Sequence, residues 1–260
     1  MPPLAALLRP TSISSMVGQE KMISTISSYI ASGTVPSMIF WGPPGSGKTT
    51  LAMVLSREVN ADFVHLSGVS SKKSDLSVIL EQAQLNKKYA KKTIVFLDEI
   101  HRRNKAQQDA LLPYVEDGTL ILIGATTENP SFTVNNALLS RCKVIVFDKL
   151  AESDIETFLI TKREEIAKHY PDREISDEVI RSIAELANGD LRNAINLLEA
   201  ALMLKQQGEI TKDDIMSAFG KPVYYDRDGE EHYNIISAVH KSLRDSDPDA
   251  SCYRIQRMLQ

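Results

Sequence analysis

The sequence predicts an α/β fold, in which a five-stranded parallel sheet is followed by a small all-helical domain. This prediction rests on short apolar runs, on helical patterns between them, and on the loss of strand patterns after about Leu150. The runs are rich in Val, Ile and Phe and mostly lack polar alternation, which is typical of strands buried on both faces of a parallel sheet. They are Ser37–Trp41, Asp62–Leu66, Thr93–Leu97, Leu120–Ala125 and Lys143–Phe147.

Helical patterns separate most of these runs, and alternation of strand and helix favours a doubly wound sheet. The predicted helices of this part are Thr49–Val59, Ser74–Tyr89 and Lys105–Val115. Helices alone are expected later in the chain, because Ser176 resembles a helix cap and Thr211 with Asp214 forms a capping-box pattern. These later helices are Ser153–His169, a helix from Ser176 to Asn188-Gly189, and Leu191–Lys205.

We therefore expect an α/β domain over residues 1–150 and a helical domain over residues 151–220. Residues 221–260 are expected to start a further helical domain, with helices at Glu231–Leu243 and Asp249–Leu259. Because the chain stops at Gln260, directly after two apolar residues, we expect it to be part of a longer protein.

Composition argues against several classes of protein. No apolar run approaches the ~20 residues that a membrane span needs, and the N-terminus lacks the basic region of a signal peptide. The two cysteines have no metal spacing, which indicates reduced thiols in the cytosol or nucleus. A net charge of −4 does not indicate a strongly basic nucleic-acid binder, although basic residues flank the third strand. They are Lys87, Lys88, Lys91, Lys92, Arg102, Arg103 and Lys105.

A phosphate-binding loop lies between the first strand and the helix that follows it. The segment from Gly42 to Thr49 fits the pattern G-x-x-x-x-G-K-[ST] at every fixed position. Glycines let backbone N–H groups curl round phosphates, and the helix N-terminus adds partial positive charge. Lys48 is expected to reach the β- and γ-phosphates, and the Thr49 hydroxyl to bind Mg²⁺. The predicted binding residues are Gly42, Pro43, Pro44, Gly45, Ser46, Gly47, Lys48, Thr49 and Thr50.

Two adjacent carboxylates end the third predicted strand. Asp98 is expected to bind the metal, and Glu99 to orient or deprotonate the attacking water. With the loop, these acids predict Mg²⁺-assisted hydrolysis, in which catalysis is largely positioning and charge stabilisation.

This arrangement resembles an AAA+ ATPase, and the resemblance implies roles for further residues. The strand that ends before Asn129-Pro130 holds sensor 1 in such proteins, which implies Thr127, with Thr126 as the rival. Ser140-Arg141-Cys142 resembles the Ser-Arg-Cys of clamp-loader ATPases, where the arginine reaches the ATP of the neighbouring subunit. Gly189-Asp190-Leu191-Arg192-Asn193 resembles the sensor 2 motif, so Arg192 is expected over the γ-phosphate in cis.

The resemblance extends upstream, where Arg9-Pro10 and Val17-Gly18-Gln19 are similar to the clamp-loader segment that borders the adenine. Val17 and Gly18 are the predicted contacts of the base.

Nearly the whole chain resembles the replication-associated recombination protein A family, whose eukaryotic members include the Werner helicase-interacting protein. The matching segments are residues 98–102, 104–109, 124–132, 225–234 and 246–250. One departure is Arg103, where the family usually has Phe.

The family resemblance implies a homo-oligomeric, DNA-stimulated ATPase with ATP and Mg²⁺ as cofactors. It implies action on single-stranded, forked or gapped DNA in replication, recombination and repair, near single-strand-binding protein and the replisome. The compartment would be the nucleus in a eukaryote and the cytoplasm in a bacterium. Two alternatives keep the same pocket: a nucleotide-dependent adaptor that recruits partners, and a AAA+ remodeller of proteins with no DNA role.

Overall fold

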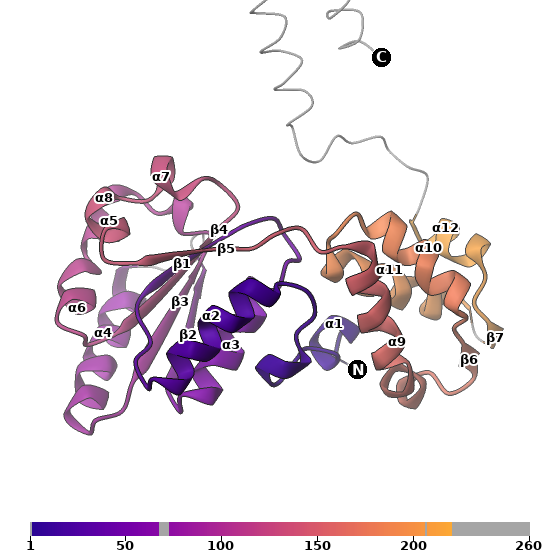
Figure 1. The fold of residues 1–260 in the computed structure, drawn as a ribbon, viewed down its shortest axis with the longest axis horizontal. Helices are drawn as coiled ribbons and strands as arrows, with labels where there is room; N and C mark the ends of the chain where they lie inside the picture. The colour runs from indigo at the N-terminus through magenta and orange to yellow at the C-terminus, as the bar shows by residue number, and fades with distance from the viewer. Residues whose placement is uncertain (1, 68–72, 206, 220–260) are drawn as a thin grey trace, which may run out of the picture. The chain divides into compact units, whose positions relative to one another are not determined.

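The structure, a computed structural model, describes residues 2–67, 73–205 and 207–219. Contacts divide the chain into Met1–Ala218 and Phe219–Gln260, and the first of these units is described below (Figure 1). The helices expected within residues 221–260, and the matching segments 225–234 and 246–250, lie outside the described residues.

A five-stranded parallel sheet forms the centre of the first part, and its order is β2-β3-β4-β1-β5. This confirms the predicted α/β fold with five parallel strands. The strands are β1 (Met38–Trp41), β2 (Asp62–Ser67), β3 (Thr93–Asp98), β4 (Ile121–Thr126) and β5 (Lys143–Val146). β1, β3 and β4 are buried along almost their whole length, which is why their sequences lack polar alternation.

Helices cover both faces of the sheet (Figure 1). Side chains alternate between the faces along each strand, so Phe40 packs with helices α2 and α3, whereas its neighbour Ile39 packs with residues of α4 and α8. The helical elements of this part are η1 (Ile13–Ser15), α2 (Glu20–Ala31), α3 (Lys48–Glu58), α4 (Lys73–Lys88), η2 (Ile100–Arg102), α5 (Lys105–Asp109), α6 (Leu112–Glu116), α7 (Pro130–Thr133) and α8 (Asn136–Leu139).

A helical layer follows β5 and has its own apolar core. Its helices are α9 (Glu152–His169), α10 (Asp177–Ala187), α11 (Leu191–Leu204) and α12 (Lys212–Phe219), with a two-residue parallel pair, β6 (Arg173–Glu174) and β7 (Gly208–Glu209). The predicted capping box before α12 is confirmed, because Thr211 N donates to Asp214 Oδ2 at 2.8 Å and Asp214 N donates to Thr211 Oγ1 at 3.3 Å.

The N-terminal segment packs with this helical layer. Leu4 and Leu8, from α1 (Leu4–Leu7) and its end, lie in the same apolar core as α9, α10 and α11. Leu4 N also donates to Glu199 Oε1 of α11 at 2.8 Å. The helical layer is therefore formed by two parts of the chain, the N-terminal segment and the helices that follow β5. The residues of the sheet lie between these two parts in the sequence. No helix among the described residues is both long and apolar enough to cross a membrane.

Candidate nucleotide site

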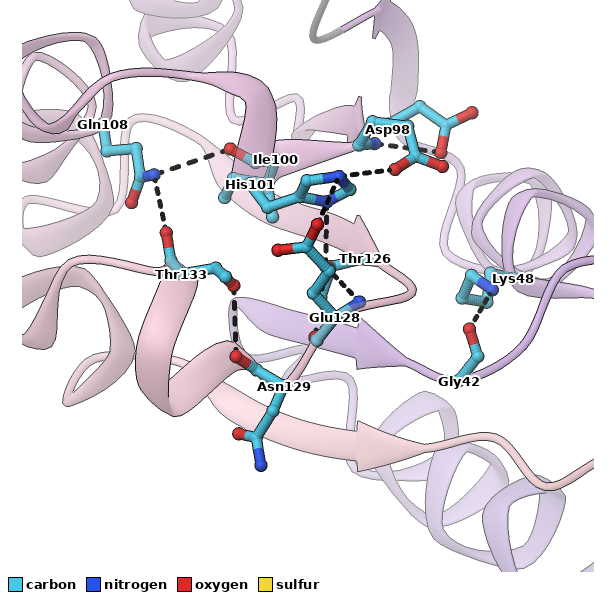
Figure 2. Close-up of polar contacts among 11 residues, drawn as sticks. Gly42, Lys48, Asp98, Ile100, His101, Gln108, Thr126, Glu128, Asn129 and Thr133 are labelled. Carbon is cyan, nitrogen blue, oxygen red and sulfur yellow. Dashed lines mark hydrogen bonds and ion pairs between the residues drawn. The ribbon is translucent and has the colours of Figure 1, made fainter. Parts of the chain in front are cut away.

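Most of the predicted site residues lie at the carboxyl edge of the sheet, where adjacent parallel strands end side by side. Trp41 of β1 is paired with Thr126 of β4, and β3, next to β4, ends at Asp98. The phosphate-binding loop leaves β1 at this edge and enters α3 at Lys48 (Figure 2).

The loop approaches its neighbours so closely that side chains are excluded at two of its glycines. A Cβ added at Gly42 would lie 2.2 Å from the backbone oxygen of Phe147. A Cβ at Gly45, whose φ is +67°, would lie 1.9 Å from Asp190 Oδ1. Asp190 caps α11 by accepting from Asn193 N at 2.9 Å, so the loop touches the start of that helix. Glycine is needed here for space as well as for backbone conformation.

Lys48 is folded against the loop. Its Nζ donates to Gly42 O at 2.7 Å (Figure 2) and also to Pro43 O at 2.6 Å. Burial lowers the pKa of Lys48 to about 8, and the charges of Asp98 and Glu99 oppose this shift. A largely buried lysine suits a polyanionic ligand, because the negative charge of the ligand would stabilise the charged ammonium.

A cavity that is open to solvent lies over the loop. Its polar side includes Lys48, Thr49, Asp98, Glu99, Thr127 and Arg192, all of them predicted site residues. The other predicted residues in the lining are Pro44, Gly45, Ser46, Gly47 and Thr50.

Arg9 and Pro10, from the segment expected to border adenine, also line the cavity. The apolar part of the lining was not expected, and it is formed by Ala5, Leu8, Phe158, Leu191 and Ile195. A signal for it exists in the sequence, because Ala5 with Leu8 and Leu191 with Ile195 have the spacing of one helix face. This spacing cannot show that two helices so far apart in the chain share a cavity.

The structure separates the two sensor 1 candidates. Thr127 is exposed and lines the cavity. Thr126 is 1% exposed, and its Oγ1 contacts His101 Nδ1 at 3.0 Å and accepts from Glu128 N at 3.0 Å. Arg192, in the first turn of α11, is exposed and also lines the cavity.

Five predicted residues lie outside the cavity lining: Gly42, Pro43, Val17, Gly18 and Arg141. The carbonyls of Gly42 and Pro43 accept from Lys48. Val17 packs against the core of the helical layer, and a Cβ at Gly18 would lie 2.8 Å from Asp154 Oδ2. Within the segment expected to border adenine, Val17 and Gly18 therefore contact the helical layer, whereas Arg9 and Pro10 line the cavity.

Arg141 lies near the amino edge of the sheet. It precedes Lys143, which is paired with Met38 at the start of β1. Its Nη1 donates to Ala137 O at 2.8 Å, and its Nε forms an ion pair with Glu116. The loop begins four residues beyond Met38, so roughly 13 Å of strand separates Arg141 from its own loop.

Thr49 and Asp98 fit a magnesium ion, because a hydroxyl and a carboxylate are hard oxygen ligands and both line the cavity. Among the described residues, no group of three or more His, Cys, Asp or Glu side chains could hold a metal. An ion at this place therefore requires phosphate oxygens and water as further ligands, as magnesium in nucleotide sites does.

The basic residues around β3 do not form one patch. Lys87, Lys91 and Lys92 precede the strand, whereas Arg102 and Lys105 follow it, so the six-residue strand separates the two groups. The first group is engaged locally, since Lys91 forms an ion pair with Asp62, and Lys87 contacts Asp117. Arg103 is only 6% exposed, so it is not part of an exposed basic patch.

Comparisons with known proteins identify two family regions. Residues 38–150 match the ATPase family associated with various cellular activities (AAA). Residues 168–244 match the AAA C-terminal domain.

Relatives match almost the entire chain. The replication-associated recombination protein A of Escherichia coli (strain K12) is 41% identical over 99% of this chain and 60% of its own length. The ATPase WRNIP1 of Dictyostelium discoideum is 40% identical over 99% of this chain and 32% of its own length. The chain thus spans 60% of the first relative's length and 32% of the second's.

A solved structure supports the same fold. The Thermotoga maritima RuvB Holliday junction branch migration motor superposes with a TM-score of 0.66 and is 28% identical. This likeness covers 82% of the present chain and 72% of the RuvB chain. With the family regions and the near-complete match to its relatives, the chain belongs to the replication-associated recombination protein A family of AAA ATPases.

Proposed function

We propose that the chain binds ATP in the cavity over Lys48 and hydrolyses it to ADP and phosphate. One observation carries the proposal: residues from the loop, the ends of β3 and β4, and α11 all line a single cavity. Such convergence of a lysine, a hydroxyl, two acids and an arginine is what phosphoryl transfer to water needs. The match of residues 38–150 to the AAA family supports the same reaction.

Binding exchanges contacts at Lys48. Its ammonium leaves the carbonyls of Gly42 and Pro43 and donates to the β- and γ-phosphates, which gives stronger, charge-assisted hydrogen bonds. The apolar wall, including Leu8 and Ile195, is the proposed surface for the adenine. Because this wall belongs to the helical layer, base binding would hold that layer over the loop.

Thr49 and Asp98 would hold Mg²⁺, which supplies charge neutralisation at the phosphoryl oxygens when bound. Glu99 would orient the attacking water and take its proton. Thr127 would hydrogen-bond the γ-phosphate or the water, and Arg192 would stabilise the γ-phosphate from the same subunit. Each of these side chains lines the cavity, which supports the assignment.

Arg141 would act on the pocket of a neighbouring subunit. Its place near the amino edge of the sheet, far along the strands from Lys48, supports action in trans. A guanidinium stabilises charge on the transferring phosphoryl group. This role requires a homo-oligomer in which one subunit's amino edge meets the next subunit's cavity.

We further propose that DNA stimulates hydrolysis and that the energy remodels DNA or DNA-bound complexes in replication and recombination. The names of the bacterial relatives and of the RuvB motor support a DNA role. Single-strand-binding protein and replisome components are the proposed partners.

The test is steady-state ATPase activity with and without single-stranded and forked DNA. Glu99→Gln is expected to bind ATP normally but hydrolyse it about 10²-fold or more slowly, and Lys48→Ala to lose binding. Glu58→Gln, an exposed change at the far end of α3, is the matched control and should behave as wild type. Turnover that DNA leaves unchanged would favour the adaptor, and full turnover in Glu99→Gln would refute the hydrolytic role.

A further inference from the structure

His101 connects the end of β3 to the end of β4. It lies in η2, two residues after Glu99, and its side chain is only 10% exposed. Its Nε2 lies 3.1 Å from Glu99 Oε2, and its Nδ1 lies 3.0 Å from Thr126 Oγ1 (Figure 2). A second carboxylate, from Glu128, lies 3.6 Å from the same Nε2. The ring thus bridges the proposed base and a buried hydroxyl on the neighbouring strand.

Hydrogen-bond accounting fixes the orientation of the ring. An ionised carboxylate can only accept hydrogen bonds, so Nε2 must carry the hydrogen that faces Glu99. The Thr126 hydroxyl can donate or accept, so Nδ1 is satisfied in either protonation state. A flipped ring would place carbon atoms opposite Glu99 and Thr126, so both contacts would be lost.

Thr126 is a rigid anchor for the ring. It ends β4, is 1% exposed, and its Oγ1 accepts from Glu128 N at 3.0 Å and lies 3.2 Å from Glu128 O. Because the strand and the turn both hold this side chain in place, its hydroxyl can fix the position of the His101 ring.

Glu99, in contrast, needs to be held. Its φ of +52° is in the left-handed region, which is uncommon for a residue other than glycine, and its side chain is 37% exposed. The backbone N donates to Asp98 Oδ1 at 3.1 Å, which fixes the peptide but leaves the rotatable bonds of the side chain unrestricted. The contact with His101 restrains the carboxylate itself.

We infer that His101 is a positioning residue for Glu99: through Nε2–H it holds Oε2 and leaves Oε1 for the attacking water. This inference rests on the proposed role of Glu99 as the base. It also gives Thr126 a function other than that of sensor 1, as the anchor that fixes the ring. Misplacing a catalytic group by about 1 Å can cost on the order of 10²-fold in rate.

Two substitutions of His101 test its contacts with Glu99 and with Thr126 separately. Glutamine places its amide nitrogen where Nε2 stands, so His101→Gln keeps a donor for Glu99. Asparagine places its amide near Nδ1, so His101→Asn keeps a partner for Thr126 and loses Glu99. We expect kcat to fall about 10- to 100-fold in His101→Asn, while His101→Gln stays within about threefold of wild type and ATP affinity stays unchanged in both. His169→Asn, a change at the end of α9 outside the cavity lining, is the control.

Glu99→Gln in the same assay distinguishes failure of this inference from failure of the proposed function. Full turnover in Glu99→Gln overturns both. Loss of turnover in Glu99→Gln with equal rates in the two His101 variants, or a faster rate in His101→Asn, overturns the inference alone. A loss of ATP affinity that matches the loss of rate also overturns it, because it would mean a structural role. If His101→Asn does not fold, Thr126→Val must lower kcat and Thr126→Ser must restore it; equal rates in these two variants overturn the inference.

Discussion

At the scale of single residues, the site holds a charged group whose pKa is shifted by burial. This group is Lys48, and its burial against the loop lowers the pKa to about 8, within the range of ordinary buffers. A lysine in water keeps its charge well above this pH. The free protein therefore loses this charge as the pH rises through about 8, whereas the phosphates of ATP favour the charged form.

This difference predicts a pH dependence of binding. Because Lys48 is almost fully charged below about pH 7, its titration should hardly change ATP affinity there. Well above the pKa of Lys48, ATP affinity should fall about tenfold for each pH unit. Isothermal titration calorimetry between pH 7 and 9.5 measures it, and above pH 8 binding should take up a proton.

Lys48→Arg is the control, because a guanidinium stays charged throughout this range. The ATP affinity of Lys48→Arg should not fall between about pH 7 and 9.5, whatever its absolute value. The same fall in Lys48→Arg would assign the titration to another group.

Gly45 tests the contact between the loop and the start of α11. In Gly45→Ala the methyl group would meet Asp190 at 1.9 Å, so the loop and α11 must separate. ATP affinity should fall by about tenfold or more, which corresponds to ~1.4 kcal/mol, as measured by equilibrium binding.

Gly33 is a matched control, since its φ of +69° is almost the same but nothing lies within 4 Å of an added Cβ. Gly33→Ala should cost roughly 1 kcal/mol of stability through backbone strain and leave ATP affinity unchanged. Equal affinities in the two variants would show that the close approach at Gly45 does not matter for binding.

Residue-scale prediction from sequence succeeded for the polar side of the cavity and failed for its apolar side. The loop motif predicted the place of Lys48, and the acids that follow an apolar strand predicted that of Asp98. The place of Arg192 in the same cavity was implied by the family resemblance. Leu8 and Ile195 have the ordinary spacing of core residues, and nothing local distinguishes a helix face that borders a ligand from one that borders a core.

At the scale of elements, the expected helix Lys105–Val115 is two helices, α5 and α6. Pro113 explains the break, because proline lacks an N–H and clashes with the preceding turn of a helix. It occupies the first turn of α6, where it is tolerated. The sequence contained this signal, and the apolar periodicity across it was misleading.

Gln108 of α5 joins the segment after β3 to the segment before α8. It is 1% exposed, and its Nε2 donates to Thr133 O at 3.2 Å (Figure 2). The same Nε2 donates to Arg103 O at 3.0 Å, and Oε1 accepts from Asn135 N at 2.7 Å. Gln108→Leu keeps the volume but leaves these backbone groups without their partner. The free energy of unfolding should fall by at least ~1–3 kcal/mol, as measured by urea denaturation.

Gln84→Leu, on the exposed side of α4, is the control and should change stability by less than about 0.5 kcal/mol. If Gln108→Leu is as stable as this control, the hydrogen bonds of Gln108 are not needed to join the two segments.

The strands were predicted to within a residue or so at each end, because a buried parallel strand is an apolar run with clear limits. The pair β6–β7 was not expected. Strands of two residues have no periodicity to detect, and their pairing depends on a contact between residues more than thirty positions apart.

At the scale of the whole molecule, the main contact that sequence reasoning could not supply is that of the N-terminus with α11. Leu4 and Glu199 are 195 positions apart. No local pattern reports such a contact, although it creates one wall of the cavity. The family resemblance implied where the nucleotide binds, and the fold shows which helices line the cavity at that place.

The proposed role of Arg141 belongs to this scale, because it requires two subunits. Arg141→Ala keeps an intact pocket, and Lys48→Ala keeps an intact Arg141, so each should be nearly inactive alone. Mixed, they should regain up to about one quarter of wild-type turnover, the share of interfaces that pair a good pocket with a good arginine in a randomly mixed head-to-tail assembly. A titration of one variant into the other, with ATPase activity as the readout, measures it. Activity no greater than the sum of the separate variants would contradict action in trans.

The most direct measurement of the central claim is a crystal structure of the chain with Mg²⁺ and a non-hydrolysable ATP analogue. The account predicts the β- and γ-phosphates against Lys48 Nζ, the metal between Thr49 and Asp98, and a water beside Glu99. Phosphates bound away from the loop, or Asp98 and Glu99 turned away from them, would contradict it.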